Sequence, residues 1–156
     1  MFFYGQFDCT MDEKGRIKMP ASLRKQFSEE DGNRFIMAKD LEDCLVIYPL
    51  KTWKKTAQKL ENLDDFNLEH RKFINASTIG LTDIELDSAD RFLVSKSLMR
   101  YLGNGKDIIL KGNGDKVQIW EASKFEQFTQ GNISNIQSLS VEVSRFLQGK
   151  NGKTEA

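Results

Sequence analysis

A short basic turn near the N-terminus carries the residue types best suited to binding chemistry. It reads Asp12-Glu13-Lys14-Gly15-Arg16, and the stretch from Lys14 to Lys25 holds no acidic residue and five basic ones: Lys14, Arg16, Lys18, Arg24 and Lys25. The Asp12 carboxylate can accept hydrogen bonds from amides of the turn, and Gly15 permits a tight bend. Arginine can grip a phosphate or the O6/N7 edge of guanine, and lysine attracts phosphates. The turn therefore favours nucleic-acid binding, although a charged turn that only aids solubility has the same composition.

Signatures of catalysis and of metal binding are missing from the sequence. His70 is the one histidine, and no G-x-S-x-G motif accompanies it. Cys9 and Cys44 form neither a C-x-x-C pair nor a cluster with zinc-ligand spacing. Two acidic pairs, typical of a helix start and of a turn, are the remaining candidates for metal carboxylates: Asp64/Asp65 and Asp87/Asp90. We therefore expect no enzyme, no catalytic residue, no metal site, no cofactor and no small-molecule substrate.

The charges of the chain balance. Its 156 residues include 23 basic and 23 acidic ones, so the net charge is zero. Bulk attraction to DNA is thereby disfavoured, and the local distribution of charge matters more. An apolar fraction of 39% and a charged fraction of 29% are typical of a globular protein with a modest core. No apolar run reaches the roughly 18 residues of a membrane span, and the start lacks the basic region of a signal peptide, so we expect a cytoplasmic protein with no membrane partner.

The sequence contains an internal repeat of low identity. Residues 12–24, DEKGRIKMPASLR, align with residues 87–99, DSADRFLVSKSLM, at an offset of 75. Residues 44–53, CLVIYPLKTW, align with residues 116–125, KVQIWEASKF, at an offset of 72. Apolar, aromatic and charged positions agree in order, and a shorter internal loop explains the change of offset. The pattern predicts a duplicated unit.

Each copy is predicted to contain a strand, a short helix and two further strands. Pro20 is suited to a helix start, and apolar spacing predicts helices over 52–63, 65–77 and 136–147. The last stripe, from Ile136 to Leu147, favours core packing over a dedicated partner helix. The predicted organisation is unit 1 at 5–51, a helical connector at 52–79, unit 2 at 80–123, a C-terminal helical region at 124–148 and a disordered tail at 149–156.

The pattern Asp12-x-Lys14-Gly15-Arg16-Ile17-x-x-Pro20-x-x-Leu23-Arg24 resembles the D-x-K-G-R motif of the MraZ family, which belongs to the AbrB-like, or SpoVT-AbrB, swapped-hairpin class. The resemblance covers nearly the whole chain. It implies an α+β fold of duplicated swapped-hairpin β-barrel units with flanking helices. It also implies a bacterial transcriptional regulator, usually a repressor of the division and cell-wall gene cluster. Such a regulator would act as a ring-like homo-oligomer on short direct repeats in double-stranded DNA and would be nucleoid-associated.

The resemblance assigns candidate DNA contacts in the first copy. Lys14 and Arg16 match the DNA-contacting positions of the family, and Gly15 shapes the turn between them. Lys18 and Arg24 belong to the same basic stretch and complete the first-copy candidates.

The second copy departs from the family motif. Asp87 and Arg91 match it, but Ala89, Asp90 and Ser95 stand where the motif has lysine, glycine and proline. Asp90 places a negative charge beside Arg91 and would weaken its attraction to phosphate. We therefore expect Arg91 to be a weak DNA contact and the second copy to serve chiefly as scaffold.

Two other functions remain open at this point. An AbrB-type antitoxin would use the C-terminal helix to grip a toxin, although such proteins usually carry a single hairpin copy. A structural protein that does not bind DNA would use its apolar stripes for assembly, and its basic turn would only aid solubility. Binding to the DNA upstream of the gene would separate these functions from that of a regulator.

Overall fold

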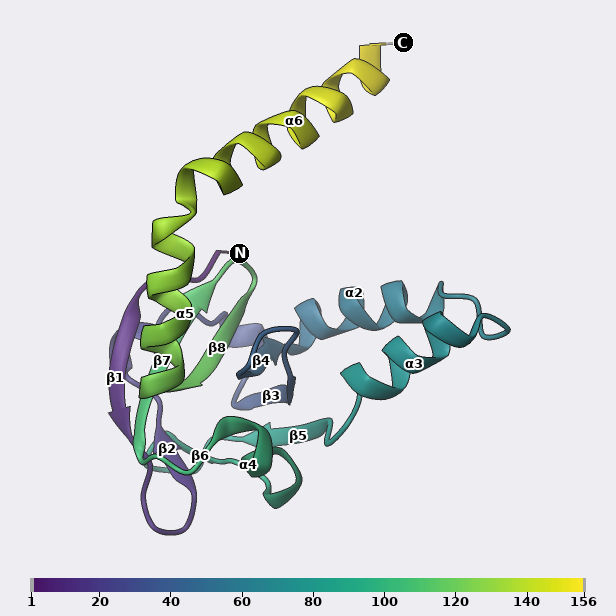
Figure 1. Cartoon of the computed structure of the whole chain (residues 1–156). Helices are drawn as coiled ribbons and strands as arrows, with labels where there is room; N and C mark the ends of the chain where they lie inside the picture. Colours follow the sequence, from purple (N-terminus) through teal and green to yellow (C-terminus); the bar gives the residue numbers. More distant parts are fainter. Residues whose placement is uncertain (1, 156) are drawn as a thin grey trace. The chain divides into compact units, whose positions relative to one another are not determined.

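The two halves of the chain contain the same elements in nearly the same order. The computed structural model describes residues 2–155, with side chains described for residues 2–150 (Figure 1). The first half forms β1 (Gln6–Thr10), β2 (Arg16–Lys18), α1 (Ala21–Arg24), the 3-10 turn η1 (Glu29–Asp31), β3 (Arg34–Lys39), β4 (Leu45–Pro49), α2 (Leu50–Glu61) and α3 (Leu68–Ser77). The second half forms β5 (Thr82–Glu85), β6 (Arg91–Leu93), α4 (Lys96–Leu102), β7 (Asp107–Asn113), β8 (Lys116–Glu121), α5 (Ala122–Ser134) and α6 (Ile136–Glu155). Apart from η1, the predicted duplication is visible in this order.

The strands of each copy pair mainly with strands of the other copy. The larger sheet has the order β1-β7-β8-β4-β3-β5, and a second sheet contains β2 and β6 alone. The first strand of one copy therefore lies beside the third strand of the other, as in β1–β7 and β5–β3, while β4 pairs with β8. The order reads the same from either edge once equivalent strands are exchanged. The two copies are thus arranged with approximate twofold symmetry within one chain.

The expected barrels are not seen in this structure. The described strands form an open six-stranded sheet with β1 and β5 at its edges, together with the small β2–β6 sheet. The physical reason is the pairing between copies: hydrogen bonds that would close a barrel within one copy are made to the other copy instead. The chain has an α+β fold built from two repeats, without a closed barrel among the residues described.

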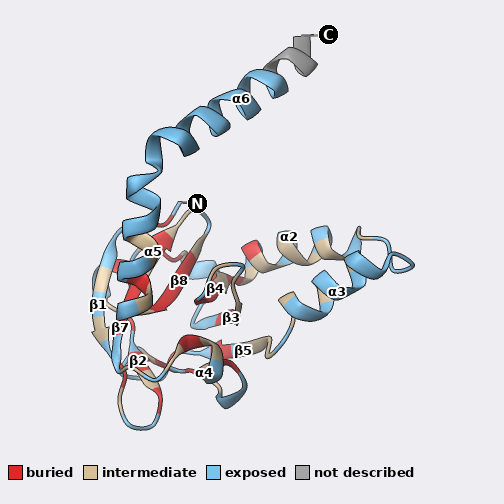
Figure 2. Ribbon diagram, in the orientation of Figure 1, coloured by how far each residue is buried: buried red, intermediate tan, exposed pale blue. Residues whose placement is uncertain are grey.

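One hydrophobic core is shared by the two copies. Equivalent residues from both enter it, including Ile17 and Phe92, which face each other in the β2–β6 sheet and are 0% and 1% exposed. Leu23 of α1 and its equivalent Leu98 of α4 are both fully buried. Figure 2 shows the buried segments concentrated on the strands, β8 among them. Burial on this scale requires both copies, so neither copy is expected to fold alone.

Local sequence explains where the helices begin. Pro20 and Pro49 stand at the N-caps of α1 and α2 in extended conformation, since proline fixes φ and needs no amide bond there. Asn67 caps α3, because its side chain accepts hydrogen bonds from the amides of Glu69 and His70.

The chain divides into two compact units after Ala122. The first unit holds both sheets and the helices from α1 to α4; the second holds nearly all of α5 and all of α6. Within α6 the predicted apolar stripe is exposed rather than packed in a core, and its members are 48–67% exposed: Ile136, Leu139, Val143, Phe146 and Leu147. The unit boundaries set out from the sequence stay predictions. The predicted tail at 149–156 falls largely outside the residues whose side chains are described.

The shared core leads to a prediction about stability. Leu23→Ala and Leu98→Ala should each lower the free energy of unfolding by about 2–5 kcal/mol, because each leaves a cavity in the same core. Leu41→Ala removes the same atoms from a side chain that is 81% exposed, and it should change the free energy of unfolding by no more than about 0.5 kcal/mol. Urea unfolding at one fixed protein concentration measures all three. Two separate transitions, with Leu98→Ala moving only one, would contradict a single core.

Candidate nucleic-acid interface

The first basic turn is organised by one carboxylate. Asp12 Oδ1 accepts hydrogen bonds from the backbone amides of Lys14 and Arg16, both at 2.9 Å, and its Oδ2 accepts one from Arg16 Nε at 2.7 Å. The Gly15 amide donates to the Asp12 carbonyl at 3.0 Å, and Gly15 has φ +83°. The turn therefore needs a residue that tolerates left-handed backbone at position 15, and it fixes the Arg16 guanidinium at the start of β2.

The second turn reproduces the first, bond for bond. Asp87 Oδ1 accepts from the amides of Ala89 and Arg91, both at 2.9 Å, and Oδ2 accepts from Arg91 Nε at 2.9 Å. The Asp90 amide donates to the Asp87 carbonyl at 2.9 Å, as the Gly15 amide does to Asp12. Arg91 is thus held at the start of β6 as Arg16 is at the start of β2.

Asp90 takes the backbone position of the missing glycine. Its φ is +59°, and it is the one residue other than glycine with positive φ among those described. Aspartate enters this left-handed region more readily than most residues because its short polar side chain can bond locally. The loss of glycine therefore leaves the geometry of the second turn intact. The missing glycine therefore gives no reason of its own to treat the second copy as scaffold. The missing lysine and the charge of Asp90 remain, so the role of the second copy stays a prediction.

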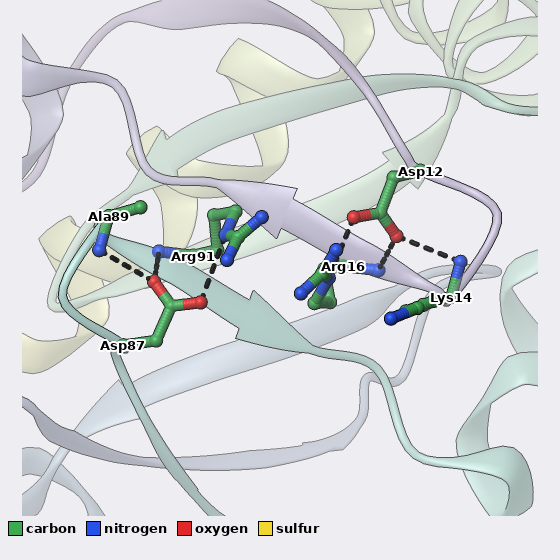
Figure 3. A network of polar contacts seen from close by, with 6 residues as sticks. All are labelled: Asp12, Lys14, Arg16, Asp87, Ala89 and Arg91. Carbon is green, nitrogen blue, oxygen red and sulfur yellow. Dashed lines mark hydrogen bonds and ion pairs between the residues drawn. The ribbon is translucent and has the colours of Figure 1, made fainter.

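The two turns meet on one small β-ribbon. β2 and β6 are antiparallel, with Arg16 opposite Leu93 and Lys18 opposite Arg91. Side chains alternate between the faces of a strand, and Ile17 and Phe92 point into the core, so the other four side chains share the outer face. Figure 3 shows Arg16 and Arg91 on the neighbouring strands, each beside its own aspartate. The ribbon gathers three basic side chains from residues about 75 positions apart in the sequence.

The remaining candidates lie in different settings. Lys14 is exposed on the first turn, beside the ribbon. Arg24 is half-buried on α1, and its Nη2 donates to the Gly32 carbonyl at 3.0 Å and to Asn33 Oδ1 at 2.8 Å. Its guanidinium also lies 6.0 Å from the ring centre of Phe35. Arg24 therefore helps to hold the loop after η1, a role that the sequence pattern did not indicate.

Hydrogen bonding lowers the pKa of both organising aspartates. The largest cause for Asp12 is the bond from the backbone amide of Arg16, and the corresponding amide of Arg91 acts on Asp87. Each pKa lies below the usual value for aspartate, so both carboxylates stay charged at neutral pH. Each also offsets part of the charge of its arginine. The ribbon presents positioned arginines without a large excess of positive charge, which fits the neutral chain.

The other polar clusters have structural partners. Asp40, Glu42 and Cys44 place their ligand atoms within 4.8 Å of one another, but the buried amide of Gln118 donates to Asp40 Oδ2 at 2.8 Å and to Glu42 Oε2 at 2.9 Å. Burial raises the pKa of the Cys44 thiol. His70 Nδ1 accepts a hydrogen bond from the Asp64 amide at 2.9 Å. These contacts join a turn to β8 and close the loop before α3, and they account for the groups without invoking catalysis.

Comparison with known proteins decides the family. The family model described as "MraZ protein, putative antitoxin-like" matches residues 2–75 and again residues 79–146. The chain belongs to the MraZ family. The two matches correspond to the two halves of the fold, so each half is one MraZ repeat. Members of this family are not enzymes, which confirms that expectation.

Several curated relatives extend over most of the chain. A protein from Cytophaga hutchinsonii named transcriptional regulator MraZ is 35% identical over 127 residues, which cover 81% of this chain and 84% of the relative. Proteins of the same name from Moorella thermoacetica and Clostridium beijerinckii are 31% and 35% identical; the matches cover 92% and 84% of this chain and 98% and 89% of the relatives. No helix in the part of the chain described has the length and apolarity needed to cross a bilayer.

One residue of the ribbon was missed by reasoning from the sequence. Leu93 lies on the outer face opposite Arg16 and is 54% exposed. The repeat alignment pairs Leu93 with Lys18, whereas its neighbour in space is Arg16. Only the register of β2 against β6 reveals that contact, and the sequence alone does not supply this register.

The bonds of Asp12 yield a prediction about pH. Arg16→Ala removes the side-chain bond and the positive charge beside Asp12 but keeps the backbone amide, which is the largest single cause of the lowered pKa. The pKa of Asp12 should therefore rise only part of the way to its usual value of about 3.9, and that of Asp87 should stay unchanged. Carboxyl-carbon NMR titration measures both in one sample.

The sign of the pH effect follows from these lowered values. The ordering of each turn by its carboxylate is fully present above the usual aspartate pKa and is lost as pH falls through the lowered folded pKa. A complete return of Asp12 to its usual pKa in Arg16→Ala would contradict the leading role of the backbone amide.

Proposed function

We propose that this protein is a sequence-specific DNA-binding transcriptional regulator that reads base edges with the β2–β6 ribbon. The observation that carries the proposal is the pair of equivalent Asp–Arg turns side by side on one exposed ribbon. A two-stranded β-ribbon fits the major groove of B-DNA, where base edges differ most. The relatives named as transcriptional regulators support the same function.

The geometry of each arginine suits recognition of a base or a phosphate. Each aspartate engages the Nε of its arginine, so the Nη1–Nη2 edge can be offered to guanine O6/N7 or to phosphate oxygens. Holding the guanidinium in advance lowers the entropy lost on binding. Lys14 and Lys18 add charge toward the phosphates. Arg91 is included as a contact of the same kind as Arg16, with its attraction reduced by Asp90.

Association of several copies would make such a small interface effective. One ribbon offers few contacts, and weak sites on one particle gain through effective concentration when DNA repeats match their spacing. The exposed apolar stripe of α6 supports association, since 48–67% exposure of these side chains is unfavourable for a single chain in water. We infer a ring-like homo-oligomer on short direct repeats.

The gene targets and the class of fold are inferred from the family resemblance. The inferred target is the division and cell-wall gene cluster, which the protein would repress from its own promoter. The inferred location is the cytoplasm, at the nucleoid. Pairing between the two copies supports an intramolecular counterpart of the swapped-hairpin arrangement.

The arginines can be tested directly against the DNA upstream of the gene. Arg16→Ala and Arg91→Ala should each weaken binding by about 1–3 kcal/mol per engaged copy and relax the sequence preference, as expected for contacts to base edges. Arg34→Ala is the matched control, because the Arg34 side chain is 61% exposed, pairs with Asp83 and belongs to β3 of the larger sheet instead of the ribbon. Fluorescence anisotropy at fixed salt gives the affinities. Equal losses in all three variants would indicate bulk charge, and unchanged binding in both ribbon variants would refute the proposed site.

The role of the α6 stripe can be tested by a pair of valines. Val143 lies on the stripe and Val141 on the opposite face of the helix, and they are similarly exposed, at 57% and 51%. Val143→Asp should reduce the mass of the assembly measured by light scattering, because burying the charge in an apolar contact is costly. Val141→Asp should leave the mass unchanged. A monomeric wild-type protein, or equal effects of the two variants, would contradict assembly through the stripe.

A further inference from the structure

An apolar side chain stands in the middle of the charged ribbon face. Leu93 is 54% exposed, while its chain neighbours Phe92 and Val94 are 1% and 3% exposed. Phe92 and Val94 therefore make the core contacts of this segment, and Leu93 is not part of the core. Its neighbours on the outer face are basic, with Arg16 directly opposite and Arg91 two residues away on the same strand.

The strand pairing brings Leu93 close to Arg16. The Val94 amide donates to the Gly15 carbonyl and the Met19 amide to the Asp90 carbonyl, and bonded pairs alternate along an antiparallel ladder. Arg16 and Leu93 thus form a pair without mutual backbone bonds, in which side chains stand closest. Leu93 also leans toward the first turn, since its Cδ1 would lie 3.8 Å from a Cβ placed on Gly15. A base read by Arg16 would therefore have Leu93 beside it.

The major groove offers one kind of apolar group to such a side chain. Among the four bases, the C5 methyl of thymine is the apolar feature there, whereas phosphates and the minor groove present polar atoms. We propose that Leu93 contacts the C5 methyl of a thymine adjacent to the base read by Arg16. This inference rests on the proposed function and adds a residue that determines sequence preference.

The same residue breaks the symmetry of the ribbon. The backbone of the two turns is equivalent, but the position equivalent to Leu93 in the first copy is Lys18. Arg16 therefore has an apolar neighbour across the ribbon, and Arg91 has a basic one. A symmetric ribbon would read both directions of a site alike. This ribbon has unlike neighbours for its two arginines, so it distinguishes the two directions of a site and suits direct repeats of one orientation.

Removal of single methyl groups from the DNA tests the contact. Thymines of the upstream repeats are replaced by deoxyuridine one position at a time, which deletes the methyl and keeps the Watson–Crick edge. The full-length protein should lose about fourfold in affinity per engaged copy at one position of each repeat, the loss expected for one buried methyl group. Leu93→Ala should bind all these probes alike. Leu93→Met keeps an apolar group and should retain the effect, as should the control Leu41→Ala, whose side chain is 81% exposed in the β3–β4 turn.

The outcomes separate this inference from the proposed function. If the wild-type protein binds and Arg16→Ala weakens it, but no deoxyuridine position matters, the role of Leu93 is refuted and DNA reading by the ribbon stands. If Leu93→Ala shows the full deoxyuridine effect, the role of Leu93 is likewise refuted and DNA reading by the ribbon stands. If the wild-type protein binds no upstream DNA, both proposals fail. Far-ultraviolet circular dichroism of the variants establishes that they are folded.

Discussion

The carboxylate that binds its arginine four residues later is the interaction on which the site depends. In each copy one aspartate accepts two backbone amides and one guanidinium Nε, so a single side chain shapes the turn and aims the arginine. The ability to bind then depends more on where the two arginines are held than on how much positive charge the chain carries. A chain of zero net charge can hold such a site, because the aspartate orients the guanidinium while it reduces long-range attraction to other anions. The low pKa of both aspartates keeps the two carboxylates charged across the physiological pH range.

A single copy of the repeat could not build the ribbon. β2 and β6 have three residues each and, among the strands that the structure describes, pair only with one another, so each completes the other's outer face. Their inner side chains, Ile17 and Phe92, lie in the core that the copies share. The hydrophobic effect that joins the copies therefore also sets the distance between the two arginines. Stability and the geometry of the site therefore depend on the same contacts.

Local features were predictable from the sequence, and pairings between distant segments were not. The duplication, the helix start near Pro20 and the turn around Gly15 follow from residue type and spacing. The prediction of barrel units was wrong because sheet order depends on pairing between residues that lie roughly 45 to 105 positions apart in the sequence. Asp90 was judged by its charge, although its tolerance of positive φ decides the shape of the turn. Arg24 looked like part of the basic stretch, but its contacts with the loop after η1 depend on tertiary packing.

The two copies have diverged where divergence leaves the fold intact. Core positions and the Asp–Arg pairs keep their character, since a change there would open the core or release the arginine. The two other positions on the outer face of the ribbon are under neither constraint, and there Lys18 and Leu93 occupy equivalent positions with opposite chemistry. A duplicated unit with approximate twofold symmetry would by itself favour a palindromic ligand. The difference between Lys18 and Leu93 on this face gives the ribbon a direction, and a particle built from such subunits can follow repeats that all run the same way.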